Sequence, residues 1–219
     1  MATTTSRRAK LKIDILDSPD RLTKTTKGLA SHDPGYEISA SVSSPELGEH
    51  CEEFVRFIAE YVLSGNSIRA GETLAYGYWL TKAELTDGRT LVFFEYNPEA
   101  TEFVFGVTHT LTYWRDQTSL CNREGADFIP PRPDQMVVIS DGVYEGDNVE
   151  GVRYASPSHM SGWWLTTDRY NGKIESLKTV HAHHVSAKRP DLAKFLALPN
   201  GYRFFSPTGA VWFDEKAAK

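Results

Sequence analysis

Three histidines near the C-terminal end of the sequence are the residues best suited to metal chemistry. They are His181, His183 and His184 in the segment SLKTVHAHHV. We predict a strand here, in which His181 and His183 point to one side and His184 to the other, so that two imidazoles can approach one ion. A third ligand then has to come from elsewhere, with His159 and Asp168 as candidates. Because the HxH spacing lacks an HExxH motif or a carboxylate context, we favour histidines that line a half-buried sheet and hydrogen-bond locally. The sequence therefore predicts no metal ligands and no cofactor.

Carboxylates and thiols give no stronger sign of an enzyme. Glu95 and Glu102 lie on successive predicted strands near a turn, where we expect both to be solvated rather than to act as an acid and a base. No GxSxG, GxxxxGK or GxGxxG motif occurs. Cys51 and Cys121 have no CxxC spacing, so we expect two reduced thiols rather than a disulfide or a zinc site. We therefore predict no catalytic residues and do not expect an enzyme.

Residues suited to binding another protein lie between positions 141 and 164. The segment DGVYEGDNVEG, from 141 to 151, holds four acids and no base among its glycines, so we predict an exposed loop with a negative field. Trp163 and Trp164 are adjacent, so in a strand one faces inward and the other faces outward or into a second layer. An outward tryptophan can anchor a partner, but the N-terminal half can equally cover it. The predicted partner-binding residues are Asp141, Tyr144, Glu145, Asp147, Glu150, Tyr154, Trp163 and Trp164.

Length and charge restrict the class of partner. The chain has 219 residues and a formal net charge of -5, which disfavours nonspecific nucleic-acid binding and suits a basic protein partner. Its apolar stretches, such as Leu91 to Phe94, are far shorter than the ~20 residues of a membrane span. No apolar run follows the arginines of MATTTSRRAK, so we expect no secretory signal, no membrane partner and a cytoplasmic location. The oligomeric state stays open.

The first half of the chain alternates helix and strand signals. Ser44 and Pro45 start a helix that ends at Gly65, with Leu47, Cys51, Phe54, Val55, Ile58 and Val62 on one buried face. ETLAYGYWLTKAEL and RTLVFFEYN flank an Asp87-Gly88 turn and predict a hairpin. TEFVFGVTHTLTYW alternates apolar residues from Phe103 to Tyr113, which predicts a third, longer strand.

The second half reads as short strands around one short helix. We predict five extended segments, QMVVIS, GVRYASP, SGWWLTTD, SLKTVHAHHV and GYRFF. The last segment, AVWFDE, is predicted to be an edge strand. Pro190 starts a helix whose Leu192, Phe195 and Leu196 face inward. The fold class is therefore α+β, with mainly antiparallel sheets and a few short helices packed on them.

The chain divides where proline and composition interrupt these patterns. Residues 1–35 are rich in Thr, Ser, Lys and Arg and predict a flexible arm with one short strand at Leu11 to Leu16. Pro130, Pro131 and Pro133 cannot sit inside a regular ladder, so we place a boundary there. The predicted regions are 1–35, 36–129 and 134–219.

The C-terminal region carries a recognisable order of motifs. It runs Ser161-Gly162-Trp163, a turn, a strand over residues 177–185, Pro190 with Leu196, then LPNGYRF with Pro199, Gly201 and Phe204. This order resembles the Imm33 type of immunity protein, a family of bacterial polymorphic toxin systems related to the DUF2185 domain. The family's acidic stretch after Ser-Gly-Trp is replaced here by WLTTDRY, and the first half has no counterpart, so the likeness is to an Imm33-like relative. The shared motifs are mostly structural and support the fold more than any site.

The resemblance implies a cytoplasmic protein that binds and neutralises a cognate toxin or effector delivered between competing bacteria, with type VI secretion as one route. Such a protein has no reaction of its own. Two alternatives stay open: a metal-dependent hydrolase that uses the cluster of His181, His183 and His184, and a carbohydrate- or small-ligand-binding module that stacks ligands on exposed Trp and Tyr rings.

Overall fold

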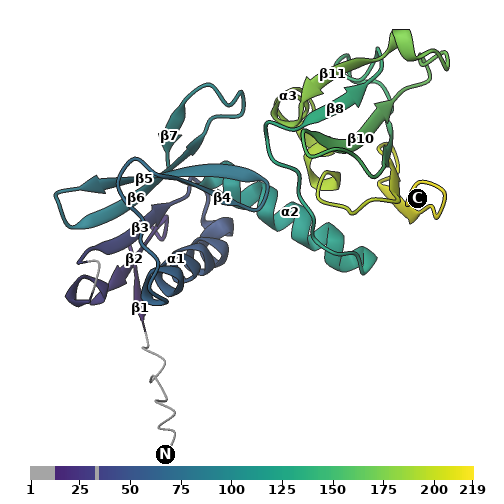
Figure 1. Cartoon of the computed structure of the whole chain (residues 1–219). Coiled ribbons are helices and arrows are strands. Elements are labelled where there is room, and N and C mark those ends of the chain that lie inside the picture. The colour runs from purple at the N-terminus through teal and green to yellow at the C-terminus, as the bar shows by residue number, and fades with distance from the viewer. Residues whose placement is uncertain (1–12, 33–34) are drawn as a thin grey trace, which may run out of the picture.

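Two β-sheets, joined by a long helix, make up the structure. The computed structural model describes residues 13–32 and 35–219, and Figure 1 shows the two sheets as separate lobes with α2 (Thr108–Glu124) between them. Most strand pairs are antiparallel, with β3–β6 and β8–β10 as parallel pairs. The predicted α+β class is confirmed. No helix in the described part of the chain is both long enough and apolar enough to cross a lipid bilayer.

The first lobe is a sheet with one helix packed on it. Its strand order is β1-β2-β3-β6-β5-β4, and β7 pairs with β6. The strands are β1 (Asp14–Asp17), β2 (Thr23–Lys27), β3 (Glu37–Ser41), β4 (Thr73–Tyr76), β5 (Trp79–Thr86), β6 (Thr90–Tyr96) and β7 (Phe103–Phe105). The second lobe has the order β11-β8-β10-β9-β12-β13. Its strands are β8 (Met136–Ile139), β9 (Glu150–Arg153), β10 (Met160–Thr166), β11 (Lys178–His181), β12 (Tyr202–Phe205) and β13 (Ala210–Phe213).

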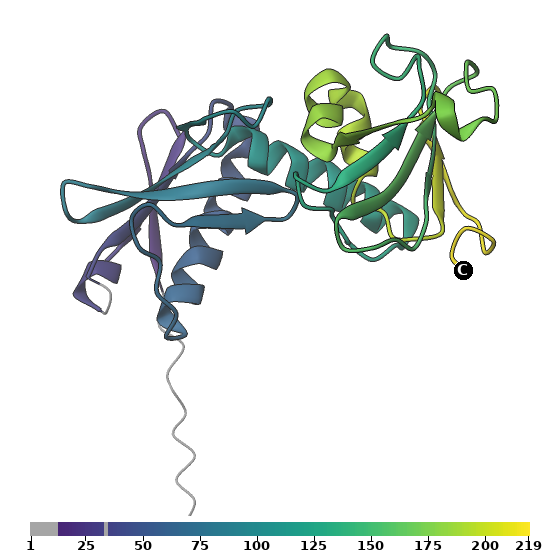
Figure 2. The ribbon, with the colours of Figure 1, turned by 45° about the horizontal axis from the view of Figure 1, so that its top comes forward.

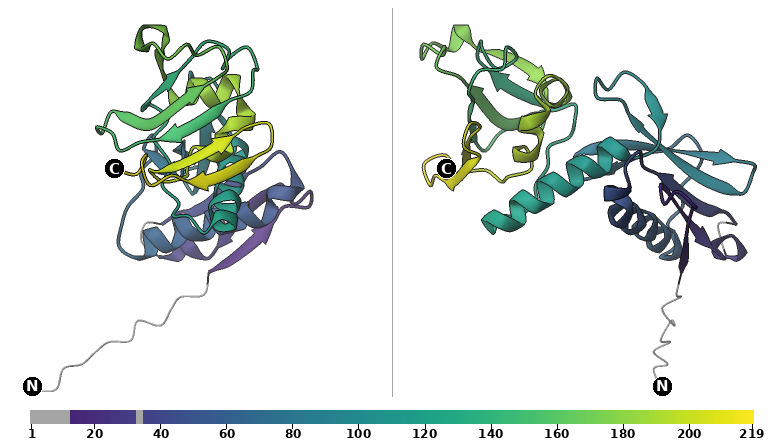
Figure 3. Two further views of the ribbon diagram at one scale, coloured as in Figure 1. Left: turned by 90° about the vertical axis from the view of Figure 1, so that its right-hand side faces the viewer. Right: turned by 180° about the vertical axis from the view of Figure 1, so that it is seen from behind.

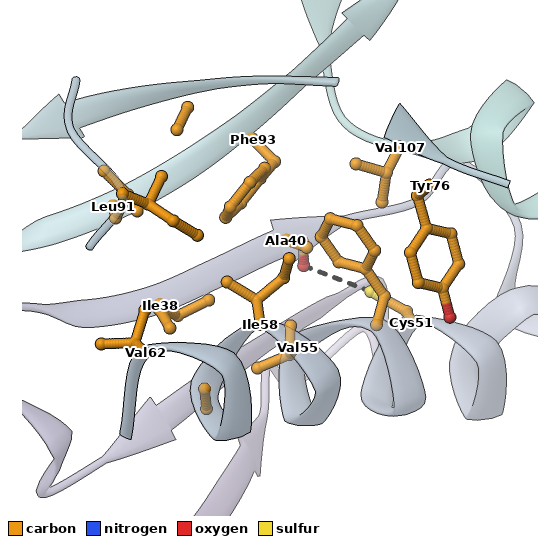
Figure 4. Packing of buried hydrophobic residues seen from close by; sticks show 14 of the residues in the cluster. Ile38, Ala40, Cys51, Val55, Ile58, Val62, Tyr76, Leu91, Phe93 and Val107 are labelled. Carbon is orange, nitrogen blue, oxygen red and sulfur yellow. Dashed lines mark hydrogen bonds between the residues drawn. The ribbon is translucent and has the colours of Figure 1, made fainter. Parts of the chain in front are cut away.

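The predicted first helix is present as α1 (Gly48–Leu63), preceded by the 3-10 helix η2 (Pro45–Leu47). Its predicted face is buried, as Figure 4 shows for Val55, Ile58 and Val62, which point toward the sheet. The Cys51 thiol donates a hydrogen bond to the Ala40 carbonyl, with Sγ and O 3.4 Å apart. Ser44 is the N-cap residue of η2, but its side chain makes no capping hydrogen bond.

The N-terminal segment contains more regular structure than the sequence predicted, and β1 overlaps the one short strand expected at Leu11 to Leu16. β1 pairs with β2, β2 pairs with β3, and the 3-10 helix η1 (Leu29–Ser31) follows, within the segment expected to be a flexible arm. The threonines of TKTTK favour a strand because they are β-branched, and the hydroxyls of Thr23 and Ser41 lie 2.8 Å apart across the β2–β3 pair. Residues 1–12 of the expected arm lie outside the described residues. The boundary at residues 130–133 stays a prediction.

The predicted hairpin is confirmed as β5 and β6, joined by a turn at Asp87 and Gly88. The segment predicted as its first strand is itself split, because Gly77 has a positive φ of 61° and turns the chain between β4 and β5. A Cβ at Gly77 would lie 2.8 Å from the Trp114 ring, so a larger residue would not fit. Alternation of apolar residues alone did not reveal this turn.

The predicted third strand is wrong after its first residues. β7 ends at Phe105, Gly106 adopts a φ of 99°, and the helix α2 starts at Thr108. A positive φ leaves the strand region of backbone space, so the ladder cannot continue. Leu111 and Tyr113 fit an alternating strand pattern, but they also lie on the buried face of α2. That face continues through Gln117, Leu120 and Cys121.

Helices cover the inner face of the second sheet. α3 (Ala182–Lys188), the 3-10 helix η4 (Pro190–Phe195) and α2 supply side chains to one buried cluster with Trp163 and Phe204. The predicted helix at Pro190 is thus confirmed, with Leu192, Phe195 and Leu196 buried. β13 forms the predicted edge of this sheet.

The first lobe also contributes to this second cluster. Tyr78 and Trp79, at the turn between β4 and β5, are fully buried among its residues. The Tyr78 hydroxyl lies 3.0 Å from the Ser186 hydroxyl on α3. Figures 2 and 3 show the two lobes from other sides, with α2 running between them. The two lobes are therefore joined by packed side chains as well as by the chain itself.

Candidate partner-binding surface

The two adjacent tryptophans divide between the faces of β10, as the strand geometry predicts. Trp163 is fully buried, and its indole N–H donates to the Leu196 carbonyl over 2.9 Å. Trp164 is half-buried on the opposite face, where its ring meets the edge of Tyr154 at a centroid distance of 6.2 Å. Trp163 is therefore part of the core, and Trp164 belongs to the face that can meet a partner.

Strand register defines the rest of that face, which we call the outer face. Residues directly opposite on neighbouring strands point the same way, and Trp164 lies beside Val152, Val152 beside Arg203, and Arg203 beside Trp212. One step along, Glu150 lies between Thr166 and Phe205. Trp212, Phe205 and Tyr154 are 40%, 37% and 36% exposed. The outer face of the second sheet thus presents several exposed aromatic rings.

Sequence reasoning missed Arg203, Phe205 and Trp212. The segments GYRFF and AVWFDE were predicted to be strands, but nothing in the sequence told which neighbour each strand would have. Only the pairing of β12 with both β9 and β13 brings these residues beside Glu150 and Val152. Their alternation with buried residues, such as Phe204, was the signal that could have placed them on the outer face.

Basic residues from other segments offset the acids of the 141–150 segment. Asp141 pairs with Lys178 over 2.8 Å, and this contact holds the pKa of the Asp141 carboxyl below its usual value. Asp147 pairs with Arg169 over 2.6 Å, and Glu150 with Arg203 over 2.7 Å. Within the described residues Glu145 has no ion-pair partner at this range. Glu150 lies in β9 rather than in the predicted loop.

Shallow polar hollows lie where this loop meets the end of β10. One, of about 500 Å³, is lined by Asp147, Asn148, Asp168 and Arg169. Its neighbour, of about 300 Å³, is lined by Asn148, Glu150, Thr166, Thr167, Asp168 and Phe205. Asp168 is exposed at both hollows. This border of the outer face can accept a long basic side chain, because carboxylates line it and an aromatic ring is adjacent.

Tyr144, predicted to bind a partner, instead packs against the core of the second lobe. It is half-buried against the second core cluster, and burial raises the pKa of its phenol to about 12. Its hydroxyl oxygen is buried without a hydrogen-bond partner in the described part of the chain. Among the predicted partner-binding residues, the Tyr144 side chain therefore packs inward from the loop, while Glu145 and Tyr154 are exposed.

The three histidines converge, and the predicted strand is wrong in its second half. β11 ends at His181 and α3 begins at Ala182, so all three imidazoles gather at one point instead of dividing between two faces. Their ligand atoms lie within 4.8 Å of one another. Burial lowers the pKa values of His183 and His184. Neither His159 nor Asp168, the predicted sources of a third ligand, belongs to this group.

Glu95 is not the solvated carboxylate that the sequence predicted. It is 2% exposed, and its oxygens accept hydrogen bonds from the backbone N–H groups of His109 and Thr110 at 2.8 and 2.6 Å. The Thr110 hydroxyl donates a third at 2.8 Å. Burial nevertheless raises the pKa of Glu95 above its ordinary value. Glu102 is exposed, as predicted.

Arg153 holds the strands beneath the outer face in place. It is 5% exposed, and its guanidinium donates to the carbonyls of Ser161, Ile129, Leu196 and Leu198 at 2.6 to 3.2 Å. The guanidinium also lies 5.9 Å from the centre of the Trp163 ring. Burial lowers the pKa of Arg153 to about 10. β9, β10 and the end of η4 are thereby tied together.

The family comparison matches the lobe that carries this surface. Residues 116–214 match the model of the Imm33-like domain, whose description indicates an immunity protein family. The searches of curated proteins and of solved structures found no match. The matched range contains the outer face, Arg153, Trp163 and the motifs from Ser161 to Phe204 on which the resemblance rests. Residues 116–214 of this chain therefore match the Imm33-like domain model, in the region where the resemblance was expected.

Proposed function

We propose that this chain is an immunity protein that binds a cognate toxin or effector in the cytoplasm and neutralises it, with type VI secretion as the effector's route of delivery. The Imm33-like domain at residues 116–214 is the observation that carries the proposal. Inhibition by binding needs no chemistry from the inhibitor, so the chain acts without a reaction of its own. The match offers no support for a hydrolase or a carbohydrate-binding module.

We assign the contact with the toxin to the outer face and its acidic border. Trp164, Phe205 and Trp212 offer aromatic area that is already held in place by the sheet, and such rings are enriched among the residues that dominate binding energy. Glu145 and Asp168 extend this area with acids that have no ion-pair partner within the described residues. A toxin surface with an apolar centre and a rim of Lys or Arg complements this arrangement.

Coexpression with the product of an adjacent toxin gene tests the function. The wild-type chain should restore growth of cells that produce the toxin, and the two purified proteins should elute together in size-exclusion chromatography. A toxin that kills equally well in the presence of folded, abundant chain would refute the proposed neutralisation.

Alanine substitutions test the surface. Trp164→Ala and Trp212→Ala should each raise the dissociation constant by roughly 30-fold or more if they are central contacts. Phe57→Ala is the matched control, because Phe57 is 50% exposed on α1 in the other lobe. If Phe57→Ala weakens binding as much as the two tryptophan variants, or if neither tryptophan variant does so, the outer face is not the contact surface.

A further inference from the structure

The cluster of three histidines has the ligand set of a metal site. We propose that His181, His183 and His184 bind one divalent transition-metal ion, for which Zn²⁺ is the best fit, with water in the remaining position. Three neutral imidazoles and a water form a common four-coordinate zinc arrangement. The site lies at the junction of β11 and α3, apart from the outer face, and the proposal does not depend on the toxin.

Local structure explains why the three rings meet. His181 is the last residue of β11 and the N-cap of α3, while His183 and His184 lie in the first turn of that helix. The His181 and His183 rings are stacked with centroids 5.2 Å apart, and the His183 and His184 centroids are 4.2 Å apart. A strand would have sent His184 away from the other two, so the change from strand to helix creates the cluster.

Small side-chain rotations would close the site around an ion. Two nitrogens bound tetrahedrally to zinc at 2.0–2.1 Å lie about 3.3 Å apart, whereas the ligand atoms here lie within 4.8 Å of one another. His184 is exposed and the other two histidines are half-buried, so the rings have room to turn about their side-chain bonds.

One ring is already oriented by a second contact. His183 Nδ1 lies 3.0 Å from the Pro133 carbonyl, and because a carbonyl only accepts, this nitrogen carries the proton. Nε2 is therefore left with its lone pair free to bind an ion. A backbone carbonyl that holds the far N–H of a ligating histidine is a recurrent feature of metal sites, where it fixes the tautomer and the ring orientation.

The start of a helix normally disfavours a cation, but two of its backbone donors are occupied here. The Ala182 N–H donates to the Gln135 carbonyl and the His183 N–H to the Pro133 carbonyl, at 2.8 and 3.1 Å. Asp134, which carries a negative charge, lies between these two acceptors in the chain. The helix is also only seven residues long. The local field is therefore compatible with a bound cation.

Metal binding would strengthen the connection between the lobes. α3 holds the histidines at its first turn and Ser186 one turn later, where the hydroxyl contacts Tyr78 of the first lobe. An ion that binds the native state and not the unfolded chain stabilises the native state, by an amount that grows with the logarithm of the ion concentration relative to the dissociation constant. A rise in melting temperature is therefore the expected consequence of occupancy.

The test uses the full chain without a polyhistidine tag, stripped with a chelator and titrated with Zn²⁺ by calorimetry. We expect one ion per chain, a higher melting temperature with Zn²⁺, and the visible spectrum of a four-coordinate centre when Co²⁺ replaces zinc. The double variant His181→Gln, His184→Gln should lose all three properties, because Gln keeps hydrogen-bonding capacity but ligates poorly. The control His159→Gln removes an exposed histidine outside the cluster and should bind as wild type does.

Circular dichroism of the metal-free proteins shows whether the variants are folded, and the single variant His184→Gln, at an exposed position, provides a second test. It should weaken zinc binding at least tenfold. Absence of stoichiometric binding to the wild type, or equal binding by the folded double variant, would overturn the site. Because the probe is the metal alone, this result is separate from toxin neutralisation.

Discussion

Glu95 in the first lobe and Arg153 in the second are the two most deeply buried charged side chains of the described residues, and their charges are opposite. Within the described part of the chain, neither side chain forms an ion pair with a carboxylate, lysine or arginine. Glu95 accepts hydrogen bonds from N–H groups at the start of α2, and Arg153 donates to carbonyls at the end of η4 and in neighbouring segments. Each charge lies where a helix leaves backbone groups without partners inside the helix.

The difference lies in how many segments each charge connects. Glu95 joins β6 to one turn of α2. Arg153 joins β9 to β10, to the segment after α2 and to the residues after η4. Removal of Glu95 should therefore disturb one helix end, whereas removal of Arg153 should loosen most of the second lobe. The predictions below test this contrast.

The largest effect should come from Trp163, whose ring lies against Arg153. Trp163→Ala removes a fully buried ring and should lower the free energy of unfolding by about 3–5 kcal/mol, as measured by urea denaturation. Trp164→Ala is the adjacent control and should change stability much less, because Trp164 is half-buried on the outer face. Equal losses in the two variants would mean that both faces of β10 act as core.

Arg153→Met should destabilise the chain by about 3 kcal/mol or more, because it leaves several buried carbonyls without donors. Arg169→Met is the control: Arg169 is an exposed arginine paired with Asp147, and its loss should alter stability by less than about 1 kcal/mol. Chemical denaturation of both variants gives the comparison. A stable Arg153→Met protein would show that apolar packing alone holds the second lobe together.

Glu95→Gln should have a smaller effect that depends on pH. Burial raises the pKa of Glu95 in the folded state, so the folded protein keeps this proton to a higher pH than the unfolded chain does. The stability that protonated Glu95 contributes is present below its ordinary pKa and is lost as pH rises through the folded value. The wild type should therefore lose stability relative to Glu95→Gln as the pH rises above the ordinary glutamate pKa of about 4.3. Parallel stability curves would contradict the raised pKa.

The smallest effect on folding should come from the surface acids of the 141–150 segment. Asn or Gln at Asp141, Glu145, Asp147 and Glu150 should leave thermal stability nearly unchanged, because exposed ion pairs contribute little. The same variant should associate more slowly with a basic toxin, and the wild-type association rate should fall as salt rises.

A charge-matched control separates a local effect from net charge. Four exposed acids of the first lobe, Glu46, Glu49, Glu60 and Glu102, can be changed to Gln with the same change in net charge. Stopped-flow measurement at low salt should show slow association only for the variant in the second lobe. Equal association rates for both variants would mean that the toxin binds a different surface.

Local signals in the sequence were sufficient for several elements. The helix at α1, the turn at Asp87 and Gly88, and the helix at Pro190 each depend on capping or turn residues and on nearby apolar spacing. The division of Trp163 and Trp164 between two faces followed from strand geometry, although which one was buried did not. The resemblance from Ser161 to Phe204 led to the domain that the comparison found.

The rest depends on contacts between distant segments. α2 and α3 were missed because two residues separate β7 from α2 and none separates β11 from α3, so one periodic pattern was extended across each junction. The partners of Glu95 and Arg153 are backbone groups, which side-chain spacing does not reveal. The bases that offset Asp141, Asp147 and Glu150 come from 22 to 53 residues away in the chain. The 141–150 segment is acidic in the sequence, but in the folded chain basic side chains offset part of its negative charge.

The position of α2 limits how the region that matches the Imm33-like domain can be moved into another protein. The family match begins at Asp116, inside α2, and Tyr113 from the preceding turn is buried in the second core together with Tyr78 and Trp79 from the β4–β5 turn. A fragment cut at the proline-rich segment would expose the apolar surface that these side chains cover. A chain that receives this region must therefore supply other side chains in place of Tyr78, Trp79 and Tyr113. In this sense the N-terminal lobe contributes part of the core of the C-terminal lobe.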